Sequence, residues 1–124
     1  MITSQVMSQD FQPGDFLVFQ RESGFGLLRV LAIDEAEKDI VWHLAGYSDL
    51  FPDVDTADAA IANGRYLSRS ESHIALTNRA FESTQVAKIG HTPIQDDELA
   101  AYDEWKAAEA VVSDRSVRLM LGLR

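Results

Sequence analysis

Hydrophobic and polar positions alternate with the period of β-strands along the first part of the chain. Residues 15–20 (DFLVFQ) follow a Pro-Gly pair, which is typical of a turn. Two apolar sets alternate within this predicted strand, Phe16 with Val18 and Leu17 with Phe19. Because both faces are apolar, we expect the strand to be covered on both sides, or to lie in a small closed barrel against a helix.

Two further strands follow at short intervals. The segment RESGFG, residues 21–26, predicts a reversal in which Gly24 and Gly26 can take positive φ. Residues 27–33 predict the next strand. Regular alternation puts Val30 and Ala32 on one face of it, and Leu27, Leu31 and Ile33 on the other. A charged turn leads to residues 40–47, where Ile40, Trp42 and Leu44 alternate with Val41, His43 and Ala45. These strands form a predicted meander.

After Pro52 the pattern changes to that of a helix. Residues 55–64 have Asp55 or Thr56 as the expected N-cap and Asn63-Gly64 as the stop. Residues 72–77 then predict a fourth strand and residues 84–91 a fifth, separated by a turn or a single helical turn at residues 78–83.

The C-terminal third favours helices. Residues 92–112 predict a long helix that Asp96 or Asp97 caps, with acids in its first turn. Its expected apolar face consists of Ala101, Trp105, Ala108 and Val112, with Tyr102 on the flank. Ser113 can cap a last short helix in residues 113–124, which we expect to fold back onto the sheet or the preceding helix; a dimer contact is the alternative.

The expected fold is therefore α+β. We predict a small, strongly bent antiparallel sheet, an SH3-like barrel, with one inserted short helix and C-terminal helices. The 124 residues fit one domain, 1–124, in which residues 1–10 are expected to be flexible. The order of the strands in space does not follow from the pattern.

Charge and composition narrow the classes of function. The net charge of −9 disfavours direct binding to nucleic acid and favours a basic protein partner. The absence of cysteine excludes disulfides, thiol nucleophiles and cysteine-ligated metals. The sequence has no apolar run long enough for a bilayer and no secretory signal, so we expect a cytoplasmic protein that does not bind membranes. We expect it to be a monomer or a homodimer.

The candidate motifs for chemistry are weak. Gly24-Phe25-Gly26 lacks the third glycine of a dinucleotide loop, and the acids from Asp49 to Asp58 lack the glycine and glutamate spacing of a calcium loop. The three histidines, His43, His73 and His91, share no local ligand spacing, although they can still meet in space. We therefore expect no enzyme activity, no catalytic residue, no cofactor and no metal site.

Large aromatic residues suggest an interaction surface instead. Trp42 and Trp105 fall on inward faces, so we assign them to the core. Tyr47 and Phe51 lie in a loop between a strand and a helix, where aromatic anchors can contact a partner. The predicted partner-binding residues are Tyr47, Asp49, Phe51, Asp53 and Asp55.

Two stretches resemble known bacterial proteins. PGDFLVFQRESGFGLLRVL, residues 13–31, resembles the opening of small SH3-like bacterial domains, among them immunity proteins of polymorphic-toxin systems. Residues 72–105 are similar to a tail in uncharacterised bacterial proteins of that kind, in which a strand leads through F-E and I-G-H-x-P-I to an acidic helix. The resemblance implies that the barrel wall and its loops form a surface for a protein partner.

Three hypotheses about function follow. The first is a non-catalytic protein-binding module, such as an immunity or inhibitor protein. The alternative is a small-molecule or metal-binding barrel, which would need a pocket joining the three histidines. A third, a regulatory domain that acts on nucleic acid through a partner, would need Arg115, Arg118 and Arg124 to contact phosphate.

Overall fold

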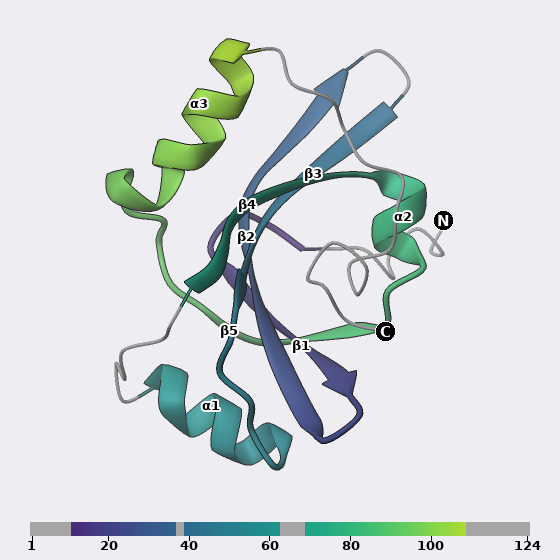
Figure 1. Ribbon diagram of the computed structural model, residues 1–124, viewed down its shortest axis with the longest axis vertical. Helices are drawn as coiled ribbons and strands as arrows, with labels where there is room; N and C mark the ends of the chain where they lie inside the picture. Colours follow the sequence, from purple (N-terminus) through teal and green to yellow (C-terminus); the bar gives the residue numbers. More distant parts are fainter. Residues whose placement is uncertain (1–10, 37–38, 63–68, 109–124) are drawn as a thin grey trace, which may run out of the picture.

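The computed structural model describes residues 11–36, 39–62 and 69–108 of the chain, and Figure 1 shows their arrangement. The elements follow one another as β1 (Asp15–Arg21), β2 (Gly24–Ala36), β3 (Asp39–Tyr47), α1 (Val54–Ala62), β4 (Arg69–Thr77), α2 (Asn78–Glu82), β5 (Val86–His91), the short 3₁₀ helix η2 (Asp96–Leu99) and α3 (Ala100–Ala108). The α+β class and the five strands agree with the sequence-based prediction.

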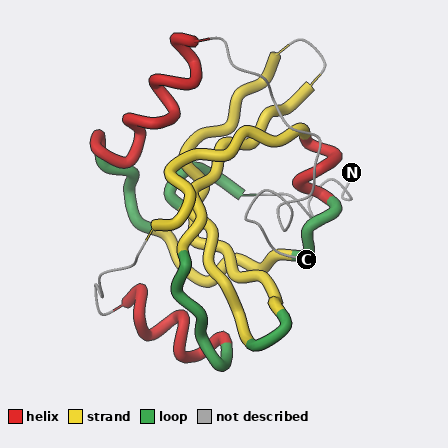
Figure 2. The backbone as a smooth tube through the Cα atoms, viewed as in Figure 1, coloured by secondary structure: helices red, strands yellow, loops and turns green. Residues whose placement is uncertain are grey.

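The five strands form one antiparallel sheet. Its order is β4-β3-β2-β1-β5, so β1 pairs with β2 on one side and with β5 on the other. β4 and β5 form the two edges, and the tube view shows how strongly the strands between them twist (Figure 2). Within the described part of the chain the sheet is open, and closure into a barrel stays a prediction.

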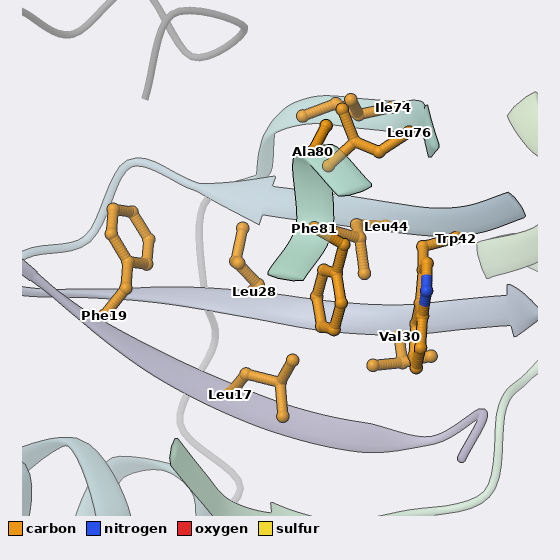
Figure 3. Packing of buried hydrophobic residues seen from close by; sticks show 10 residues of the cluster. All are labelled: Leu17, Phe19, Leu28, Val30, Trp42, Leu44, Ile74, Leu76, Ala80 and Phe81. Carbon is orange, nitrogen blue, oxygen red and sulfur yellow. The ribbon is translucent and has the colours of Figure 1, made fainter. Parts of the chain in front are cut away.

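One face of the sheet carries the larger apolar core. Phe81 of α2 stacks on Trp42 with ring centroids 4.1 Å apart, and the indole Nε1–H of Trp42 donates to Asn78 Oδ1 at 2.8 Å. Figure 3 shows the cluster, which comprises Leu17, Phe19, Leu28, Val30, Trp42, Leu44, Ile74, Leu76, Ala80 and Phe81. Burial of these side chains against α2 stabilises the sheet by the hydrophobic effect. The core assignment of Trp42 is confirmed.

The opposite face is divided between two helices, α1 and α3, which lie on the side away from α2 (Figure 1). Under α1 this face is apolar, with Phe16, Val18, Leu27, Tyr47, Phe51, Ala57 and Ala60 in one buried cluster. The expectation that β1 is covered on both faces is thus confirmed, because Phe16 and Val18 belong to this cluster and Leu17 and Phe19 to the other.

A β-bulge in β2 changes the predicted alternation. Val30 pairs with Leu44, but Ala32 already pairs with His43, so β2 holds one residue more than β3 at this point. After the extra residue, Ile33 packs on the Trp42 side of the sheet and not on the side of Leu27. The prediction that Val30 and Ala32 share a face was therefore wrong. The bulge also turns Asp34 toward α3.

Several predicted element ends need correction. The carboxylate of Asp53 accepts hydrogen bonds from the backbone N–H and the hydroxyl of Thr56, both at 2.7 Å, so this carboxylate caps α1 in place of Asp55 or Thr56. Residues 92–112 do not begin as an α-helix: Gln95 caps η2, and α3 starts only at Ala100. Tyr102, expected on the flank, is the buried residue of α3, whereas Trp105 is half-buried and Ala108 exposed.

Some expectations lie outside the described residues. These are the stop at Asn63-Gly64, the apolar contact of Val112, the tail at residues 113–124 with Arg115, Arg118 and Arg124, and the flexibility of residues 1–10. Among the helices that the structure does describe, none has the length and apolar character that crossing a membrane requires.

Candidate functional site

A polar region occupies the part of the sheet that α3 covers. Four side chains of the sheet belong to it: Arg29 and Asp34 from β2, His43 from β3 and His73 from β4. From above, η2 contributes Glu98, while α3 contributes Tyr102 and Trp105. We call these seven residues the polar face. The apolar cluster under α1 lies on the same side of the sheet, so hydrophobic and charged groups occupy separate halves.

A buried ion pair attaches η2 to the sheet. The guanidinium of Arg29, which is only 3% exposed, donates to both carboxylate oxygens of Glu98, from Nε at 2.9 Å and from Nη2 at 3.1 Å. Arg29 Nη1 donates to the carbonyl of Gly14 at 2.7 Å, and Arg69 adds a longer contact to Glu98 at 3.4 Å. Burial raises the pKa of Glu98, but the hydrogen bonds from Arg29 and from the Gln95 N–H outweigh it and bring this pKa below its ordinary value.

Four side chains form a hydrogen-bonded network beneath α3. His43 Nε2 lies 3.0 Å from Asp34 Oδ2, and His43 Nδ1 lies 2.9 Å from His73 Nε2. The hydroxyl of Tyr102 donates to both oxygens of Asp34 at 3.0 Å. The ring of Trp105 lies against both imidazoles, with centroids 4.9 Å from His43 and 5.5 Å from His73. Strands β2, β3 and β4 are thereby joined to α3.

The partners of the two imidazoles determine their tautomers. A carboxylate only accepts hydrogen bonds, so neutral His43 carries its proton on Nε2, facing Asp34. His43 Nδ1 is then an acceptor, and the neighbouring His73 Nε2 must donate. This leaves the lone pair on His73 Nδ1, for which the described residues offer no hydrogen-bond partner. The network thus runs from the Tyr102 hydroxyl to an acceptor on the edge strand.

Burial keeps both imidazoles neutral. Desolvation lowers the pKa of His43, and the nearby Asp34 carboxylate opposes this only in part. For His73, burial and then the neighbouring His43 lower the pKa to about 4. Burial, followed by the hydrogen bond to Asp34, raises the pKa of Tyr102, so its hydroxyl remains protonated. At neutral pH both imidazoles and the Tyr102 hydroxyl are therefore uncharged, and the carboxylate of Asp34 contacts two of these three groups, His43 and Tyr102.

The three histidines do not converge. His91 lies on β5, at the other edge of the sheet from His73, where its Nδ1 is 2.7 Å from the buried carboxylate of Asp15. In addition, no cluster of three or more His, Cys, Asp or Glu side chains within residues 11–36, 39–62 and 69–108 is arranged to hold a metal ion. The pocket joining the three histidines, which the metal-binding alternative requires, is absent from this part of the chain.

The predicted partner-binding residues divide into buried and exposed ones. Tyr47 and Phe51 are buried in the apolar cluster under α1, and the backbone of Phe51 pairs with that of Phe25 through two hydrogen bonds of 2.8 and 2.9 Å. Asp49 is half-buried, whereas Asp53 and Asp55 are exposed. The two aromatic rings therefore cover the sheet, and Asp53 and Asp55 are the exposed members of the predicted set.

Sequence reasoning missed two groups of residues. Leu50 and Val54, which are 42% and 36% exposed, are the large hydrophobic side chains that face solvent within the described ranges. The other group is Asp34 and Tyr102 as partners of His43; the sequence left open that the histidines meet in space, and His43 and His73 do so. One signal was available for them, since His43 stands among apolar residues in the strand predicted at residues 40–47.

Comparisons of this chain with protein-family models, with curated proteins and with solved structures found no match.

Proposed function

We propose that this chain is a non-catalytic protein-binding module, of the immunity or inhibitor kind, that binds a basic protein through the loop before α1 and the first part of that helix. The observation that carries the proposal is the exposure of Leu50 and Val54 between exposed acids. We call this surface the loop patch; it consists of Leu50, Asp53, Val54, Asp55 and Asp58.

The chemistry of the loop patch suits such a partner. Apolar side chains that lose contact with water supply most of the affinity of a protein interface. Surrounding carboxylates favour a cationic partner and accelerate its approach, which agrees with the net charge of −9. The patch is also held in place from below, because Phe51 is buried between Leu50 and the α1 cap at Asp53. A preorganised loop loses little conformational entropy on binding.

The finer architecture is part of the same proposal. We propose that the whole chain forms a small SH3-like barrel whose loops contact the partner. The strongly twisted five-stranded sheet is compatible with this architecture, and the resemblance of residues 13–31 and 72–105 to SH3-like bacterial domains supports it. The absence of enzyme activity belongs to the proposal too, and it rests on the lack of a catalytic motif in the sequence.

The test compares three forms of the protein as bait. Wild type, a Leu50→Ser/Val54→Ser variant and an Asp55→Asn/Asp58→Asn variant are used to capture proteins from native lysate, with quantification by mass spectrometry. Asp96→Asn/Asp97→Asn is the matched control, because it removes the same charge from exposed acids of η2. Asp53 is left intact because it caps α1.

The expected result is at least one basic protein that wild type and the control variant capture equally and both loop-patch variants lose. In calorimetry with that purified protein, each loop-patch variant should weaken binding by about 10-fold or more. The proposal is wrong if the captured basic proteins bind the loop-patch variants as well as wild type, or if none is enriched.

A further inference from the structure

The two helices on the α1–α3 side of the sheet are held by different forces. α1 contributes alanines to an apolar cluster, in which Ala57 and Ala60 are buried. By contrast, the contacts of η2 and α3 with the sheet are made by polar and aromatic groups, namely Glu98 on Arg29, Tyr102 on Asp34 and Trp105 against the histidines. A helix docked in this way responds to the charge of the groups beneath it.

We propose that Asp34, His43, His73 and Tyr102 form a pH-sensitive latch, which holds α3 on the sheet at neutral pH and releases it when the imidazoles take up protons. This device is independent of the loop patch, which lies beside α1.

The geometry accommodates one added proton and not two. If His43 is protonated, its Nδ1 becomes a donor, and His73 can accept that hydrogen bond only by moving its own proton to Nδ1. If both rings are protonated, two N–H donors with positive charge face each other across 2.9 Å. That hydrogen bond is then lost, and like charges repel at short range.

The surrounding charges do not compensate for two imidazolium ions. β2 provides one carboxylate, Asp34, and β4 provides His73 itself. α3 provides the Tyr102 hydroxyl and Lys106, whose charge further disfavours protonation of His43. Glu71 of β4 lies beyond a register shift, opposite Gly46. Two protons therefore leave the site with a net positive charge under a helix that carries another cation.

The direction of the response follows from linkage. The pKa of both histidines is lowered in the closed state, and opening α3 returns them toward their ordinary value of 6.5. The open form consequently binds more protons, and it gains population as the pH falls from 6.5 toward the closed-state pKa of His73, about 4. Above this range the latch is closed.

One contact should survive the opening. The pKa of Glu98 lies below its ordinary value, so its carboxylate stays charged and bound to the buried Arg29. We therefore expect α3 to move away from the sheet while η2 stays attached. Opening would expose Trp105 and the histidine pair, and leave the ion pair intact.

Hydrogen exchange measured by mass spectrometry tests the latch on the full chain. Between about pH 7.5 and pH 5, after correction for the intrinsic exchange rate, the opening constant of residues 100–108 should rise about 10-fold, because a proton then binds the open form preferentially. Residues 54–62 of α1 serve as the internal reference and should not change.

Two variants separate the latch from a general effect of acid. His73→Gln keeps a side-chain donor for His43 but cannot take up a proton, so the pH response of α3 should fall below that of wild type, to the part that His43 alone carries. His91→Gln is the matched control, because His91 pairs with Asp15 outside the network, and its response should equal that of wild type. An NMR titration of the wild-type histidines provides a second readout. Unchanged exchange of α3 at low pH, a wild-type response in His73→Gln, or a His73 that titrates near 6.5 would overturn the proposal.

Discussion

Replacing Glu98 by alanine should destabilise the fold far more than replacing any exposed acid of α3. Glu98→Ala removes two hydrogen bonds to the Arg29 guanidinium and leaves that cation with 3% exposure to water. A buried charge that loses its partner costs about 3 to 5 kcal/mol. Arg29 keeps its bond to the Gly14 carbonyl at 2.7 Å, so we expect a somewhat smaller loss, about 2 to 4 kcal/mol.

Urea unfolding followed by circular dichroism measures this loss. The matched control is Glu104→Ala, which removes the same charge and side chain from an exposed position of α3 and should change stability by less than about 0.5 kcal/mol. In thermal unfolding, Glu98→Ala should lower Tm by roughly 10 °C, given about 3 to 5 °C for each kcal/mol in a domain of this size.

A double-mutant cycle shows whether the loss arises from the pair. Arg29→Met removes the charge that Glu98 leaves unpaired, so the double variant should be more stable than the sum of the single losses predicts, by at least about 1.5 kcal/mol. Additive effects, or a Glu98→Ala variant as stable as Glu104→Ala, would refute the reasoning that the ion pair anchors η2.

Three further predictions concern other parts of the molecule. In urea titrations, the free energy of unfolding of wild type should fall by about 1 to 2 kcal/mol between about pH 7.5 and pH 5, because unfolding returns the pKa of His73 from about 4 to 6.5. Solvent screening at this half-buried site keeps the loss below its full value. A free energy of unfolding that stays constant over this range would contradict the prediction. Gly14→Ala should cost about 1 to 3 kcal/mol of stability, because φ is +100° and a Cβ would lie 2.6 Å from the Thr92 carbonyl oxygen. Gly90→Ala is the control and should be nearly neutral, because a Cβ there would lie 3.4 Å from Ile61. Equal melting temperatures for the two variants would show the strain argument to be wrong. Phe81→Ala should cost about 3 to 5 kcal/mol in urea titrations by leaving a cavity beside Trp42, and a loss below 1 kcal/mol would mean that the core collapses around it.

The sequence predicted the parts of the fold that depend on local patterns. The meander of β1, β2 and β3 and the faces of β1 follow from alternation and turn residues, since each is determined by neighbours in the chain. The bulge in β2 did not, because residues 30–33 around it are all apolar and an extra residue leaves no mark in such a run. The helix predicted from residue 92 also began late, since acids near Asp96 suit a 3₁₀ turn as well as an α-helix.

The polar face could not be predicted from the sequence either, because its contacts join residues that are far apart in the chain. Its four network residues come from four different elements, and Tyr102 is 68 positions from the carboxylate to which it donates. Such pairing depends on how the sheet is covered, which periodicity does not determine. The sequence also suggested Tyr47 and Phe51 as exposed anchors, but both are buried. The backbone pairing of Phe51 with Phe25 turns that ring inward and leaves Leu50 outside.

The bulge in β2 also decides how related chains should be aligned with this one. A regular strand with the same sequence would carry Asp34 to the Trp42 side, far from His43, without any substitution in the network. A related chain that lacks one residue at position 31 would restore the regular ladder and keep the carboxylate beside His43. A one-residue gap at position 31 is therefore compatible with a preserved network. An ungapped alignment with identical residues does not by itself show that the network is preserved, because the side of the sheet on which Asp34 lies depends on the strand register at Val30 and Leu44.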